Sequence, residues 1–232
     1  MTRHSASLLI FLAMVSVIAN AQDPAFNTWS TVELKCHLNK WDFSAETELR
    51  STNILEHTNR LSLELAATYS LNKHLKAGAS YMPISFYDLK YDDYQLRHRA
   101  SLFVTGRQKF GDFTFTLREK LQMTIKDESD RIDEDGVTDT YKINPELTWR
   151  NRIKVEYDVP KLPLTPALSF ETFRQMNNPD GNVFCGLRYS VALGYKLNKR
   201  SKLELSGLYD HEINISDPEN TFVLGFGYTF DF

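Results

Sequence analysis

The sequence has little cysteine and, beyond its N-terminal stretch, no long hydrophobic run. Its two cysteines, Cys36 and Cys185, have neither the CxxC spacing nor the Cys/His spacing of a metal site, so no metal or cofactor is expected. The topology predicted below places them near opposite rims of the fold, which argues against a disulfide. After residue 21 no apolar run reaches the roughly 20 residues that a membrane helix needs. Any membrane-spanning part of this chain must therefore consist of strands.

A surplus of positive charge is also missing. The 232-residue chain has 27 Lys and Arg residues against 30 Asp and Glu residues, a formal net charge of -3. Because this balance gives no general basic surface, no nucleic-acid partner is expected.

Residues 1–21 have the pattern of a signal peptide. Arg3 and His4 form a short basic start, Leu8 to Ile18 is apolar, and residues 19–21 (Ala-Asn-Ala) form a small-x-small cleavage site. The apolar run is too short to cross a bilayer as a helix. We therefore predict a cleaved signal peptide over 1–21 and one β-barrel domain over 22–232, a length sufficient for a single barrel.

The C-terminal segment 221–232, TFVLGFGYTFDF, alternates strictly between two kinds of residue. One face of the expected strand is large and apolar and ends at Phe232, whereas the other face is small or polar. This pattern is typical of a strand between lipid and a lumen, although the last strand of a soluble barrel can share it. Upstream, the chain repeats an alternating strand, a tight turn, an alternating strand and a longer polar loop. The predicted hairpins span 31–50, 60–81, 97–124, 147–174 and 187–209.

These hairpins and the closing strand add up to eleven strands, which conflicts with the even numbers of bacterial single-chain barrels. Either Asp23 to Trp29 contains part of a further strand, or one assigned strand is wrong. We favour about twelve strands, with ten as the alternative. An odd barrel closed by a parallel pair of strands is the least favoured arrangement.

Two residues interrupt the expected strands. Pro83 has no backbone N–H to donate and is predicted to end regular pairing. Glu119 falls on an otherwise apolar face, and a β-bulge near Arg118 would turn it away from that face.

Three features favour a membrane barrel over a soluble one. Short turns alternate with longer loops, and the face opposite the apolar one is heavily charged, whereas a soluble ligand-binding barrel would need an apolar interior. Aromatic residues of the apolar face also gather at the strand ends, as the two girdles of a membrane barrel do. One girdle is Trp41, Tyr69, Phe113, Tyr157, Tyr195 and Phe230, and the other is Tyr81, Trp149, Tyr209 and Phe222.

Four segments resemble an uncharacterised family of exported outer-membrane β-barrel proteins of Gram-negative bacteria, family 2490 of the domains of unknown function. They are the closing GFGYTFDF, the hairpin YKLNKRSKLELSGLYDHEIN, the loop NNPDGN and the strand WRNRIKVEY. The resemblance covers nearly all of the chain after the signal peptide. It implies an antiparallel up-and-down transmembrane β-barrel in the bacterial outer membrane, and it supplies no catalytic residues to assign to this chain. Resemblance to outer-membrane barrels in general implies that Phe232 is an assembly signal read by the barrel-assembly machinery.

The charged inner face is the main candidate for a functional site. Its ion pairs could fill a narrow lumen and satisfy one another. Alternatively, they could line a selective channel or small-solute site that prefers anions. The candidate lumen charges are Arg97, Arg99, Arg150, Arg152, Lys154, Glu156 and Glu64.

The acidic stretch Lys126 to Thr140 is the longest irregular segment. Its carboxylates would suit Ca²⁺, but they lack the spacing of an EF-hand, so a solvated, mobile extracellular loop is the favoured interpretation.

An enzymatic role is not expected. No GxSxG element occurs, and the nearest pairs, His98 with Ser101 and His211 with Ser206, have odd spacings that place their members on opposite faces of a strand. The sequence thus predicts an outer-membrane barrel, surrounded by outer-membrane lipid, that acts as a narrow pore or a small-solute-binding or structural barrel. The alternative is a lipid-modifying outer-membrane enzyme with a site at the rim.

Overall fold

The computed structural model describes residues 25–52, 57–132, 136–215 and 218–232, and the predicted signal peptide over 1–21 lies outside these ranges. All regular secondary structure in the described residues is β-strand. These residues contain no helix long and apolar enough to cross a membrane. The strands are β1 (Ala25–Leu38), β2 (Trp41–Thr52), β3 (His57–Ser70), β4 (Leu75–Asp88), β5 (Asp93–Phe110), β6 (Phe113–Lys126), β7 (Glu146–Tyr157), β8 (Leu164–Gln175), β9 (Phe184–Lys196), β10 (Ser201–Glu212) and β11 (Asn220–Asp231).

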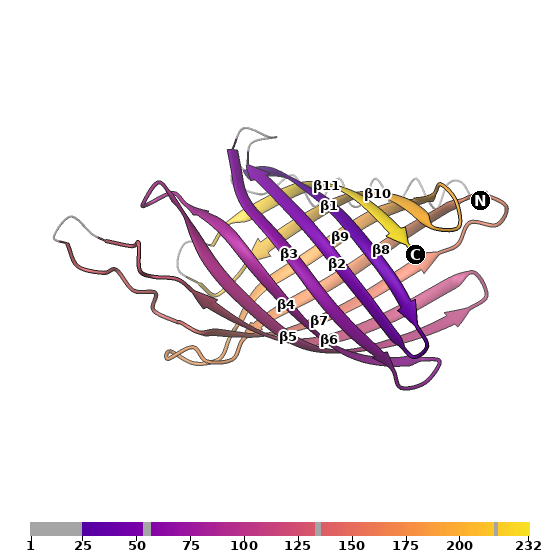
Figure 1. Cartoon of the computed structure of the whole chain (residues 1–232), viewed down its shortest axis with the longest axis horizontal. Coiled ribbons are helices and arrows are strands. Elements are labelled where there is room, and N and C mark those ends of the chain that lie inside the picture. The colour runs from indigo at the N-terminus through magenta and orange to yellow at the C-terminus, as the bar shows by residue number, and fades with distance from the viewer. Residues whose placement is uncertain (1–24, 53–56, 133–135, 216–217) are drawn as a thin grey trace.

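The strands form one closed barrel in which each strand pairs with its neighbours in the sequence (Figure 1). All of these neighbouring pairs are antiparallel, so the predicted all-β up-and-down barrel is confirmed. The barrel closes where β1 meets β11, and this pair alone is parallel, from Ala25 opposite Thr221 to Lys35 opposite Asp231.

The described part of the chain therefore builds eleven strands, close to the predicted number of about twelve. The least favoured arrangement, an odd barrel with a parallel seam, is the one observed. Part of a further strand within Asp23 to Trp29 is one of the two alternatives predicted from the sequence; the described residues of that segment, Ala25 to Trp29, are the first residues of β1. Because β1 already pairs with β2 on one side and β11 on the other, the barrel has no edge left for a further strand.

Alternation along each strand divides the barrel into an apolar outside and a charged inside. On β6, for example, Phe113, Phe115 and Leu117 are exposed on the outer surface, whereas Thr114 and Lys120 are buried inside. Aromatic side chains also meet in pairs at both ends of the outer surface. Near the short turns these pairs are Trp41–Tyr69 (5.0 Å between ring centroids) and Phe113–Tyr157 (4.7 Å), and near the long loops Tyr209–Phe222 (4.8 Å).

Two local predictions are wrong. Pro83 does not end β4, which continues to Asp88 and stays in unbroken register with β5. The missing N–H affects only the other side of the strand, where pairing with β3 stops after Tyr81 and resumes at Ile84.

The second wrong prediction is the bulge near Arg118. The registers of β6 with β5 and with β7 are continuous there, so Glu119 stays on the outer surface. Its carboxylate accepts a hydrogen bond of 2.8 Å from Trp149 Nε1, and Asn151 lies directly opposite it on β7. The register shifts that the structure does contain lie at Arg50/Ser51 and at Phe173/Arg174.

Turns and loops separate to opposite ends of the barrel. The loop between β6 and β7 reaches farthest from the barrel, at the left of Figure 1. Cys36 lies near the short turns, Cys185 lies near the loops, and both are free thiols, as the predicted topology requires.

Candidate functional site: the charged lumen

The inner face of the barrel encloses a cavity of about 660 Å³. Because the side-chain period of a strand is two, the inward positions of neighbouring strands fall side by side and form one continuous wall. Nine cationic side chains line the cavity, namely Arg50, Arg60, Arg99, Arg118, Lys120, Arg150, Arg152, Lys154 and Arg188. Acidic residues line it as well, and these are Glu33, Glu46, Glu48, Glu64, Glu146, Glu171, Glu204, Asp210 and Glu212.

Ion pairs between strands satisfy many of these charges. Glu171 is the main acceptor: it is 3% exposed, and its Oε1 lies 3.0 Å from Arg150 Nη2 and 3.2 Å from Arg118 Nη2. Further pairs are Arg50–Glu48 (2.7 Å), Lys120–Glu64 (2.9 Å) and Arg188–Asp210 (2.7 Å between Nη2 and Oδ2). The expected ion pairs are thus present along the wall, yet they leave an open cavity between them.

Five of the seven predicted lumen charges lie on the cavity wall, and these are Arg99, Arg150, Arg152, Lys154 and Glu64. The other two lie nearer the ends of the barrel. Arg97 stacks on Phe86, 3.7 Å from the ring centroid, and donates a hydrogen bond to Tyr141 Oη in the β6–β7 loop. Glu156 lies close to the short-turn end of β7 and forms an ion pair with Lys154, with 3.1 Å between Nζ and Oε1.

Sequence reasoning missed two carboxylates that organise the site. Glu171 and Asp210 hold the arginines of β6, β7 and β9, but they were not assigned to the charged face. Alternation would have identified both, because Leu168 and Phe170 on β8, and Leu205 and Tyr209 on β10, mark the opposite outer face. Alternation also places Met82 on the inner face of β4, since Tyr81 faces outward, but the predicted end of pairing at Pro83 hid this signal.

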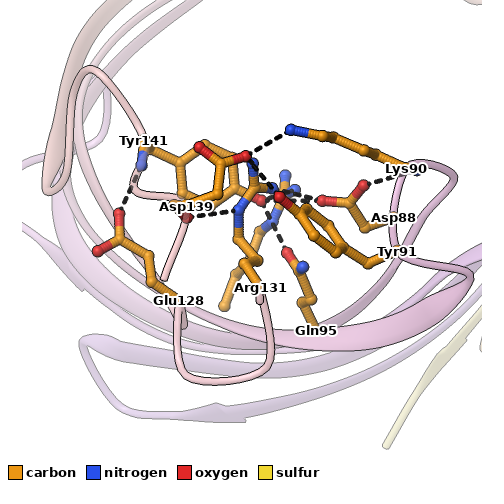
Figure 2. A network of polar contacts seen from close by, with 9 residues as sticks. Asp88, Lys90, Tyr91, Gln95, Glu128, Arg131, Asp139 and Tyr141 are labelled. Carbon is orange, nitrogen blue, oxygen red and sulfur yellow. Dashed lines mark hydrogen bonds and ion pairs between the residues drawn. The ribbon is translucent and has the colours of Figure 1, made fainter. Parts of the chain in front are cut away.

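A polar cluster covers the loop end of β4 and β5 (Figure 2). Its centre is Arg131, which is 8% exposed and binds Asp88 (2.5 Å) and Asp139 (3.0 Å) through its two Nη atoms. The guanidinium also stacks on Tyr141, 3.9 Å from the ring centroid. Tyr141 in turn donates a hydrogen bond of 2.7 Å to Gln95 Oε1 on β5.

The hydrogen bond from Lys90, followed by that from Tyr91, holds the pKa of the Asp139 carboxyl well below its usual value. Arg131 and Asp139 therefore anchor the described part of the acidic loop to the β4–β5 turn, while most of its other described side chains are exposed, as the solvated-loop interpretation predicts. Within the described ranges, no group of three or more His, Cys, Asp or Glu side chains is arranged to hold a metal ion.

The histidine–serine pairs are separated by the sheet, as their odd spacing predicts. His98 Nδ1 lies 2.6 Å from the Tyr81 hydroxyl on the outer surface, whereas Ser101 is 5% exposed and faces inward. The His211 side chain contacts Asn220 Oδ1 at 2.6 Å on the face of β10 opposite the Ser206 side chain, although both residues contribute to the cavity lining.

Comparison with known proteins identifies the family and the fold. A family model described as "Protein of unknown function (DUF2490)" matches residues 26–221. No curated protein matches the chain in sequence. Among solved structures the chain resembles that of a porin, NanC, in a rhombohedral crystal form, with a TM-score of 0.53 and 13% sequence identity, over 86% of this chain and 91% of that chain. At this level of identity the likeness shows a shared barrel fold.

Proposed function

The chain belongs to the DUF2490 family, which is described only as proteins of unknown function, and from this premise we propose that it is an outer-membrane barrel offering small solutes a narrow, charged pathway or binding cavity. The observation that carries the proposal is the combination of an apolar outer surface with a charged cavity of about 660 Å³ inside the barrel. An apolar outer surface is favourable in lipid, and a charged interior is favourable in a water-filled lumen. A soluble barrel would need a polar outer surface and an apolar interior.

The dimensions favour a narrow passage over a wide one. Barrels of about eight strands are filled by their own side chains, and those of sixteen to eighteen leave an aqueous channel. An eleven-strand barrel lies between these cases, and its long Arg and Glu side chains project into the remaining space. A solute inside would therefore touch these charged groups on all sides.

Single-channel recording of the refolded protein in planar bilayers tests the pathway. We expect discrete conductance steps, smaller than those of wide porins. The chain offers a matched pair of variants in adjacent positions of β3, because Ala66 lines the cavity and Ala67 faces outward. Ala66→Trp should reduce the conductance, and Ala67→Trp should leave it unchanged. A folded protein without conductance would exclude the pore and leave the binding cavity.

Location is tested by cell fractionation together with heat-modifiable mobility on gels. The predicted signal peptide, lipid-facing surface and terminal Phe232 support export, insertion and recognition by the barrel-assembly machinery. We expect the protein in the outer-membrane fraction, with different mobilities before and after boiling. A soluble protein in the periplasmic fraction would overturn the proposal.

The proposed role is not enzymatic. In support, His98 and Ser101 lie on opposite faces of β5, and so do His211 and Ser206 on β10. Turnover of outer-membrane lipid by the purified protein would contradict this part of the proposal and favour a rim-sited enzyme.

A further inference from the structure

The arginines of the lumen outnumber the carboxylates that pair with them. Seven guanidinium groups line the cavity, those of Arg50, Arg60, Arg99, Arg118, Arg150, Arg152 and Arg188. Among the described residues, their ion pairs run to three carboxylates, Glu48, Glu171 and Asp210. Several arginines therefore share one carboxylate, and Arg99 and Arg152 make no ion pair within the described residues. The nearby Glu64 and Glu146 are paired with lysines, at 2.9 Å from Lys120 and from Lys126 respectively.

Arg60 on β3 is poorly satisfied by its protein partners. It is 8% exposed, and its Nη2 lies 3.7 Å from Glu48 Oε1, a distance too long for a hydrogen bond. The same nitrogen donates to Met82 Sδ at 3.2 Å, and a thioether is a weak acceptor. Among the residues that the structure describes, the buried Nε of Arg60 has no hydrogen-bond partner. An anion entering the cavity would thus find donors that the protein itself does not use.

Arg99 on β5 and Arg60 on β3 share a neighbour, Met82 of β4. Met82 contacts Arg60 through its sulfur and faces Arg99 in the strand register. The Nε of Arg99 donates to the neutral hydroxyl of Thr124 at 3.1 Å, and Arg99 makes no ion pair within the described residues. Arg50, Arg60, Arg99 and Arg150 line the same cavity, so their positive charges share one lumen.

Aromatic faces hold two neighbouring arginines in place without neutralising them. The guanidinium of Arg50 lies 3.6 Å from the ring centroid of Trp29, and that of Arg150 lies 4.7 Å from Phe173. A ring face attracts a cation through its quadrupole but carries no net charge. The positive field of the cluster is therefore fixed before any ligand arrives, which reduces the ordering cost of binding.

We propose that Arg60 and Arg99 form a subsite for the oxyanion of a small solute, a carboxylate or a phosphate, inside the lumen. This inference rests on the proposed function, because it names the class of solute that the charged cavity takes. Guanidinium groups match both oxyanions by donating two parallel hydrogen bonds. The cavity of about 660 Å³ has the size of ordinary small-molecule sites, so the ligand is a small organic acid or phosphate ester.

Equilibrium binding to the folded full-length barrel in detergent tests the subsite without requiring conductance. The probes are citrate, inorganic phosphate and, as a cation control, spermidine, each titrated by calorimetry in Tris chloride. We expect citrate or phosphate to bind and spermidine not to bind. Binding of only one of the two anions would assign the subsite to that oxyanion. Binding of neither anion would overturn the proposal.

Matched variants separate a local subsite from the summed charge of the lumen. Arg60→Gln and Arg99→Gln should each weaken anion affinity by about tenfold, the loss expected for one charge-assisted contact. Lys202→Gln removes the same charge from an inward side chain that is paired with Glu204 at 2.9 Å, and it should leave the affinity nearly unchanged. If all three variants lost anion affinity equally, the net charge of the lumen alone would determine the affinity, and the proposed subsite would be overturned.

The two proposals fail in different ways. If the barrel does not conduct but binds citrate, and Arg99→Gln weakens that binding, the pore is contradicted and the subsite is supported. A conducting barrel whose affinity and reversal potential in a salt gradient are unchanged in both arginine variants contradicts the subsite alone. The Arg99→Gln variant is expected to fold normally, because Arg99 makes one hydrogen bond within the described residues, to the Thr124 hydroxyl.

Discussion

At the scale of single residues, the partner of each charged side chain decides what that side chain does. Arg131 and Arg60 are both buried arginines, 8% exposed. Arg131 binds two carboxylates and fixes a loop, whereas Arg60 is left with a thioether and a distant carboxylate. The same residue type is therefore structural at the mouth of the barrel and available for binding in its lumen.

The loop cluster predicts a dependence on acid. The hydrogen bond from Lys90 is the main cause of the lowered pKa of Asp139. A carboxyl whose pKa is lower in the folded state stabilises the fold above its unfolded pKa and loses this contribution as the pH falls through the folded one. We expect the docking of the β6–β7 loop to be constant from neutral pH down to about pH 4 and to weaken below it.

Hydrogen exchange of loop amides, corrected for the intrinsic rate at each pH, measures this effect. Asp139→Asn should loosen the loop at neutral pH and remove most of the acid dependence. Asp180→Asn is the matched control, since Asp180 pairs with Lys142 on the exposed surface of the same end of the barrel. If the loop of the unsubstituted protein were equally protected at pH 2.5 and pH 7, the assigned role of Asp139 would be wrong.

At the scale of strands, close approach between neighbours depends on small residues at defined positions. Gly78 of β4 faces Phe103 of β5 in the register, and the Phe103 ring lies across the glycine. A Cβ placed on Gly78 would come within 2.6 Å of the Phe103 ring and 2.7 Å of the Ala67 carbonyl oxygen. The first contact could relax by a ring movement, but the second is with backbone.

Gly78→Ala should therefore destabilise the barrel by about 1–3 kcal/mol, the usual cost of overpacking. Gly106→Ala is the control, because a Cβ there would have no atom within 4 Å. Urea titration of folding into lipid vesicles measures both variants. Equal stabilities for the two would contradict the close packing at Gly78.

The end of β11 is predicted to matter for assembly. Phe230 pairs with Leu34 across the seam, and the Phe232 N–H donates to the Lys35 carbonyl at 3.0 Å. Deleting Phe230–Phe232 should lower the amount of protein in the outer membrane of cells. Normal membrane levels of the truncated protein would refute this.

Refolding of the same deletion in detergent separates two causes of low levels. Normal refolding in detergent would assign the loss in cells to recognition by the assembly machinery. Failed refolding would assign it to the seam contacts themselves.

At the scale of the whole molecule, the parallel seam makes a closed barrel from an odd number of strands. A disulfide between Ser30→Cys and Phe226→Cys, which face each other in the seam register, should form in a background lacking Cys36 and Cys185. The pair Ser30→Cys with Phe222→Cys is the control, since it is four positions out of register. Electrophoresis without reductant distinguishes them. Cross-linking of the control pair in preference to the first would contradict the parallel register.

Much of this architecture could be predicted from local pattern. The alternation in the segments around Leu61, Phe113 and Tyr189 correctly placed their strands and outward faces, because the period of a strand is a property of the chain itself. The wrong predictions at Pro83 and Glu119 have a common cause. Each prediction assumed that a local irregularity interrupts strand pairing. In the structure, pairing with neighbouring strands keeps the register continuous at both positions.

Alternation along the chain is enough to predict a barrel with an apolar outside and a charged inside, because it is encoded residue by residue. Which charges meet depends on the closed sheet. Lys120 and Glu64 are 56 positions apart in the chain, and β1 and β11 join its two ends. No local pattern specifies such contacts, since they depend on how the closed sheet curves around its lumen. The surplus of guanidinium groups at Arg60 and Arg99 is likewise a consequence of that closure.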